Sequence, residues 1–98
     1  MPDDTLEPGA TRIRLEQLLA IKEKTRAQLA DALAEFRHEG RRVGDRLERL
    51  GGRGAALEQQ RGLVHENVKL TRSELDKTEA QISEIRRELS KLAADQQT

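Results

Sequence analysis

The sequence predicts an all-α protein made of two long heptad-patterned helices separated by a Gly-rich break. Three observations predict this fold class. Ala, Glu, Leu, Arg and Lys dominate the composition, and Phe36 is the only aromatic residue. Such a mixture is typical of long helices that bury a narrow apolar stripe. No proline interrupts residues 11–92, and the apolar residues of this stretch recur with heptad spacing.

The first ten residues contain both prolines, three acidic residues and no apolar periodicity. We therefore expect residues 1–10 to form a flexible tail. Thr11 precedes the first periodic residues, and its hydroxyl is suited to accept a hydrogen bond from a free amide of a first helical turn. The sequence thus predicts a single coiled-coil domain over residues 11–98, with helices at about 11–50 and 55–94.

The heptad seam is the clearest pattern in the chain. Alternate steps of four and three from Leu15 reach twenty-three positions, of which sixteen are large apolar residues. A helix with so narrow a stripe buries it against another helix. We predict the following interaction seam: Leu15, Leu19, Leu29, Leu33, Phe36, Val43, Leu47, Leu50, Leu57, Val64, Val68, Leu75, Ile82, Ile85, Leu89 and Leu92.

The break at residues 51–54 contains Gly51, Gly52 and Gly54. Each glycine costs about 1 kcal/mol relative to alanine inside a helix, so the three together predict a hinge or turn. The flanking segments have nearly equal length, which favours an antiparallel helical hairpin. Leu50 and Leu57 nevertheless keep the heptad phase across the break, as one continuous coiled-coil rod would. We favour the hairpin over the rod.

Three cations, Lys22, Arg26 and Arg61, interrupt the apolar seam. A polar group at a core position lowers stability but can fix the register and the number of helices, because wrong alignments leave it unpaired. Arg61 lies between seam positions Leu57 and Val64, so we predict it as the polar register position. The alternative is that its long side chain reaches past its neighbours to solvent.

The polar run Gln59-Gln60-Arg61, midway along a heptad-patterned segment, resembles the central layer of SNARE motifs, which form parallel four-helix bundles in membrane fusion. The resemblance covers roughly residues 36–92. Counting from Gln60 places Asn67 and Glu74 at core positions, which departs from that pattern. The resemblance implies an alternative function, a helix contributed to a four-helix bundle in membrane traffic.

Residues 37–53 form a basic stretch, with six arginines against three acidic residues. Such a stretch can contact an acidic partner, although a solvated helical face is the simpler interpretation. No aromatic residue is interleaved to stack on bases, so we expect no nucleic-acid partner. His38 and His65 each lack a second histidine one turn away, and we expect both to face solvent without a metal ion or other cofactor.

The chain has eighteen cationic and eighteen acidic side chains and no cysteine. It shows no apolar run of about 20 residues that would span a bilayer and no secretory signal, so we expect a cytoplasmic protein. No nucleophile, base and orienting group are placed for chemistry, so we expect neither an enzyme nor a small-molecule substrate. The sequence predicts a non-catalytic coiled-coil adaptor, scaffold or assembly subunit, whose partner is a second copy or another protein. A small helical chaperone or secretion-associated factor is a further alternative.

Overall fold

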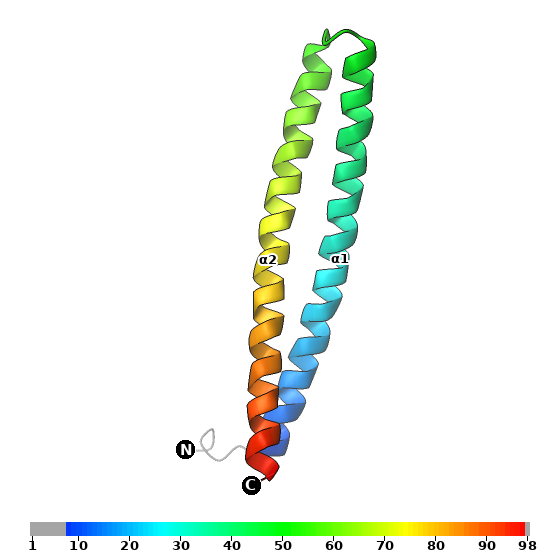
Figure 1. Ribbon diagram of the computed structural model, residues 1–98. Helices are drawn as coiled ribbons and strands as arrows, with labels where there is room; N and C mark the ends of the chain where they lie inside the picture. The colour runs from blue at the N-terminus through cyan, green and yellow to red at the C-terminus, as the bar shows by residue number, and fades with distance from the viewer. Residues whose placement is uncertain (1–7, 98) are drawn as a thin grey trace. The chain divides into compact units, whose positions relative to one another are not determined.

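The computed structural model of the chain describes residues 8–97, and side chains over residues 9–95. Two helices account for nearly all of this part: α1, Pro8–Arg49, and α2, Ala55–Gln97. The described residues contain no strand. The two helices run antiparallel and pack against each other as a hairpin (Figure 1). The predicted all-α class is therefore confirmed, and so is the choice of the hairpin over the rod.

Helix α1 begins at Pro8, and Thr11 lies inside its first turn. The prediction of Thr11 as the N-cap was therefore wrong. Proline is favoured at the first position of a helix because its φ is already helical and its missing N–H has no partner to lose there. Of the predicted tail, residues 8–10 are helical, and residues 1–7 lie outside the described residues.

The C-terminus of α1 is closed by two glycines in the left-handed conformation. Gly51 has φ +64° and Gly52 has φ +78°, values that side chains with a Cβ disfavour. The Gly52 N–H donates to the Leu47 carbonyl at 2.9 Å, and the Gly51 N–H donates to the Glu48 carbonyl at 3.0 Å. This pair of bonds is the Schellman motif, which satisfies the last carbonyls of a helix and turns the chain away from its axis.

Gly54 immediately precedes α2 on the other side of the turn. Its carbonyl accepts the first intrahelical hydrogen bond, from the Glu58 N–H at 2.9 Å. A Cβ built on Gly54 would lie 3.5 Å from Leu57 Cδ1 and 3.6 Å from Leu47 Cδ2, so a leucine from each helix closes over this glycine. The Gly-rich segment is thus a structured turn with a packed apolar floor.

The described chain divides into two units, each with a part of both helices. The turn unit comprises residues 27–76 and contains the turn itself. Its buried residues are Leu33, Val43 and Leu47 from α1 and Val64 from α2. All four lie at predicted seam positions, and both helices contribute to the interior.

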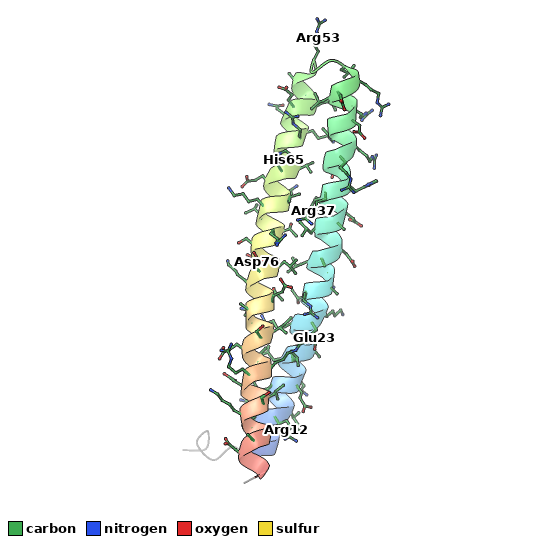
Figure 2. All side chains as sticks on the ribbon, in the orientation of Figure 1. Arg12, Glu23, Arg37, Arg53, His65 and Asp76 are labelled. Carbon is green, nitrogen blue, oxygen red and sulfur yellow. The ribbon has the colours of Figure 1, made fainter. Side chains whose placement is uncertain are left out.

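The terminal unit comprises residues 8–26 of α1 and 77–97 of α2. Its buried residues, Thr78, Ile82 and Ile85, all come from α2, and Ile82 is only 1% exposed. The Arg86 guanidinium donates to the Glu23 carboxylate across the two helices at 3.5 Å (Glu23 is labelled in Figure 2). Charged side chains thus join the two helices at the edge of this unit.

Candidate interaction site

The predicted interaction seam lies mostly along the contact between α1 and α2. Six of its residues are buried: Leu33, Val43, Leu47, Val64, Ile82 and Ile85. Nine more are half-buried: Leu15, Leu19, Leu29, Phe36, Leu57, Val68, Leu75, Leu89 and Leu92. Leu50 is 52% exposed because α1 has already ended at Arg49. The chain therefore uses the seam for its own hairpin, and most of the seam keeps some contact with solvent.

The cations at seam positions behave differently from one another. Lys22 and Arg26 are half-buried, whereas Arg61 is exposed, as are its neighbours Gln59 and Gln60. The structure thus places Arg61, the predicted register position, at the surface, and no polar layer forms between the helices at residues 59–61. A long side chain such as that of Lys22 can cover apolar neighbours with its methylene groups while its charge stays in water.

Several large apolar side chains lie off the seam and are exposed to solvent. In the terminal unit these are Ile13, Leu18 and Ile21, which is 61% exposed. In the turn unit they are Leu63, at 67%, and Leu70, which follows one heptad later on α2. None of these residues is at a position of the predicted heptad seam. A second apolar periodicity, Leu63 to Leu70, is the sequence signal for those two.

Two open grooves flank the turn unit. The balanced groove, of about 800 Å³, has three arginines and three carboxylates among its lining residues, so their formal charges cancel. It is lined by Ala34, Glu35, His38, Glu39, Arg42, Val43, Asp45, Arg46, Arg49 and Gln60. The arginines of the predicted basic stretch that line this groove are therefore matched in number by acidic residues of the same helix.

The cationic groove, of about 330 Å³, has no carboxylate among its lining residues: Phe36, Arg37, Gly40, Arg41, Val64, His65 and Val68. Its walls come from both helices, with Arg37 on α1 and His65 on α2 (both labelled in Figure 2). The valines and Phe36 make its floor apolar, and the charged side chains stand at its edge. The arginines are evident in the sequence, whereas the proximity of His65 to them depends on the hairpin register.

Of the remaining predicted features, Arg53 lies outside both grooves and the two histidines form no cluster. Arg53 lies on the turn and points away from both helices (Figure 2). His38 and His65 are exposed and line different grooves. Among the described residues, no group of three or more His, Cys, Asp and Glu side chains is placed to hold a metal ion. Neither α1 nor α2, over the described residues, has a stretch long and apolar enough to cross a membrane.

Comparison of the chain with protein-family models, with curated proteins and with solved structures gave no match.

Proposed function

We propose that the protein is a non-catalytic coiled-coil interaction module, an adaptor, scaffold or assembly subunit that binds other helices through the outer edge of its seam. One observation supports this function most directly: nine of the sixteen apolar seam residues are only half-buried in the hairpin. Two helices paired with each other cover one side of such a seam and leave the other side in contact with solvent.

The energetics favour association. Six apolar residues are buried in the described chain, which is a small interior for a folded domain. Small scaffolds with so little buried area commonly gain stability from disulfides, metals or oligomerisation. This chain has no cysteine, and oligomerisation is the route that its half-buried seam supports. A second hairpin, or helices of another protein, would complete a bundle and bury the seam further.

Light scattering coupled to size-exclusion chromatography tests the proposal. We expect a dimer or larger species at micromolar concentration, and a melting temperature that rises with concentration because association stabilises the folded state. A helical chain that remains monomeric, with a melting temperature independent of concentration, would contradict this function.

Two matched variants locate the association surface. Leu75→Asp places a charge at a half-buried seam position, whereas Ser73→Asp adds the same charge at an exposed position on the same helix. We expect Leu75→Asp to shift the chain toward monomer and to lower its helicity, and Ser73→Asp to leave both nearly unchanged. Equal effects of the two variants would show that the seam is not the association surface.

A further inference from the structure

The cationic groove lies where Gly40 allows the two helices to approach closely. A Cβ at this position would lie 3.3 Å from Val64 Cγ1, which is tighter than most such contacts. Here α1 approaches α2 closely, and two half-buried residues, Phe36 and Val68, supply the apolar surface that remains accessible in the groove beside Gly40. The groove therefore offers an apolar floor for one side chain of a bound partner.

No carboxylate lines this groove to balance its two arginines. Arg37 and Arg41 are both exposed and lie one helical turn apart, and neither is in an ion pair within the part of the chain that the structure describes. Like charges at this spacing on one helix repel each other by about 0.2–0.5 kcal/mol. A ligand that brings negative charge would relieve this repulsion and add charge-assisted hydrogen bonds to the guanidinium groups.

We propose that the cationic groove binds an acidic amphipathic helix of a protein partner. Two carboxylates of that helix, one turn apart, pair with Arg37 and Arg41, and an apolar side chain packs beside Gly40 against Phe36 and Val68. The inference rests on the proposed interaction function and names the chemistry of the partner.

The geometry favours a helix as the ligand. Four residues of a helix rise about 6 Å, so carboxylates at positions i and i+4 repeat at the spacing of the two arginines. Both walls of the groove are helices, and an amphipathic helix lying along such a groove is a common recognition mode. Proteins that bind single-stranded nucleic acids commonly stack the bases on aromatic side chains. Phe36, the only aromatic residue, is half-buried in the groove floor.

The test measures fluorescence anisotropy with the full chain and a labelled, end-blocked helical peptide that carries glutamates at i,i+4 spacing beside a leucine stripe. The same peptide with glutamine in place of each glutamate is the control ligand. The chain offers a matched pair of double variants with identical spacing and charge change, Arg37→Gln with Arg41→Gln on the cationic groove and Arg42→Gln with Arg46→Gln on the balanced groove. Circular dichroism confirms that each variant remains helical.

We expect the glutamate peptide to bind and the cationic-groove variant to weaken binding by about tenfold or more, since two charge-assisted hydrogen bonds are lost. The balanced-groove variant should weaken it less than about threefold, because only general electrostatic attraction changes. Gly40→Leu should weaken binding with all charges retained, because its side chain would press on Val64 and change the close helix approach at the groove.

Four results would overturn the inference. These are equal losses from the two double variants, equal affinity for the glutamine peptide, full binding by Gly40→Leu, and tighter binding of a labelled single-stranded oligonucleotide of equal charge. Light scattering on the same samples separates the two proposals. A chain that self-associates but does not bind the glutamate peptide contradicts only this inference, whereas a monomeric chain that binds the peptide contradicts only self-association through the seam.

Discussion

The turn unit and the terminal unit share one heptad pattern but bury different residues with it. In the turn unit, α1 and α2 both contribute buried aliphatic side chains, such as Val43 and Val64. In the terminal unit the buried residues all come from α2, and the α1 seam contains the half-buried cations Lys22 and Arg26. A heptad seam therefore tolerates long cationic side chains where their methylene groups can cover the facing helix.

The ion pairs of the two units also differ in which helices they join. The terminal unit has an ion pair between its helices, Glu23 with Arg86, and pairs within each helix, Glu23 with Arg26 and Glu84 with Arg87. In the turn unit, Arg72 pairs with Asp76 within α2. Aliphatic packing and a glycine turn thus stabilise the turn unit, and an ion pair between the helices adds to the apolar packing of the terminal unit.

The largest expected effect comes from Ile82→Asp, which places an unpaired carboxylate where the wild-type side chain is 1% exposed. We expect it to destabilise the terminal unit by at least about 3 kcal/mol. Hydrogen exchange should show lost protection over residues 77–97 and retained protection in the turn unit, which has its own buried residues. Ser83→Asp adds the same charge at the next residue, which is exposed, and should leave stability and protection nearly unchanged. Equal loss of protection in both units would show that they unfold together.

A second prediction concerns the turn. Changing Gly51, Gly52 and Gly54 to alanine strains the two left-handed positions by about 2–4 kcal/mol and favours a continuous helix. We expect opened chains that exchange helices between molecules. Spin labels at positions 19 and 89 report the change, because 70 residues of continuous helix span about 105 Å.

The spin-label measurement uses labelled chain diluted into unlabelled chain. The wild-type hairpin should keep a short distance, of a few tens of ångströms, after dilution, whereas the triple variant should lose it. Gly62→Ala is the control, because its glycine has no positive φ and a Cβ there meets nothing within 4 Å. A short distance that survives dilution in the triple variant would mean that the turn does not require glycine.

A third prediction compares the replacement of two glycines, Gly40 and Gly44, that lie one turn apart in α1. Gly44→Ala should raise stability by about 1 kcal/mol, because alanine is the better helix former and its Cβ would meet nothing within 4 Å. Gly40→Ala should gain less, since its Cβ would press on Val64. Urea denaturation of both variants measures the difference. A larger gain for Gly40→Ala would contradict the close helix approach at that position.

The smallest expected effect is the coupling between Glu23 and Arg86, which are 40% and 54% exposed. Pairs this exposed contribute about 0.2–1 kcal/mol, and salt weakens them. A double-mutant cycle with Glu23→Gln and Arg86→Gln should give a coupling in this range in dilute buffer and close to zero at 1 M salt. A coupling that is unchanged by salt would mean that packing of the two side chains, and not their charge, joins the helices.

Local rules predicted much of the fold. Heptad spacing identified the buried residues, such as Leu33 and Ile85, because side chains at this spacing share one face of a helix. The glycine penalty located the turn. The start of α1 lies at Pro8 and not at Thr11, because the preference of proline for the first helical position outweighs the capping preference of threonine.

The cationic groove could not be predicted in the same way. It depends on which residue of α2 lies opposite Gly40, and that register follows from the geometry of the turn. In the sequence, Leu50 and Leu57 keep the same heptad phase across the glycines. This phase does not say which residue of α2 faces a given residue of α1 in the hairpin. Side chains from distant parts of the sequence, such as Arg37 and His65, are therefore brought together by a property of the turn alone.

The Schellman turn also has a consequence for the order of folding. It brings Leu47 and Leu57 to Gly54 across a short loop, whereas Glu23 and Arg86 meet across 63 residues. The entropy lost on closing a loop grows with its length, so we expect helix pairing to begin at the turn and to proceed toward the chain ends. In stopped-flow experiments Leu47→Ala should then mainly slow folding, and Ile85→Val should mainly speed unfolding. The ends of the two helices would be the last part of the molecule to form and the first to open.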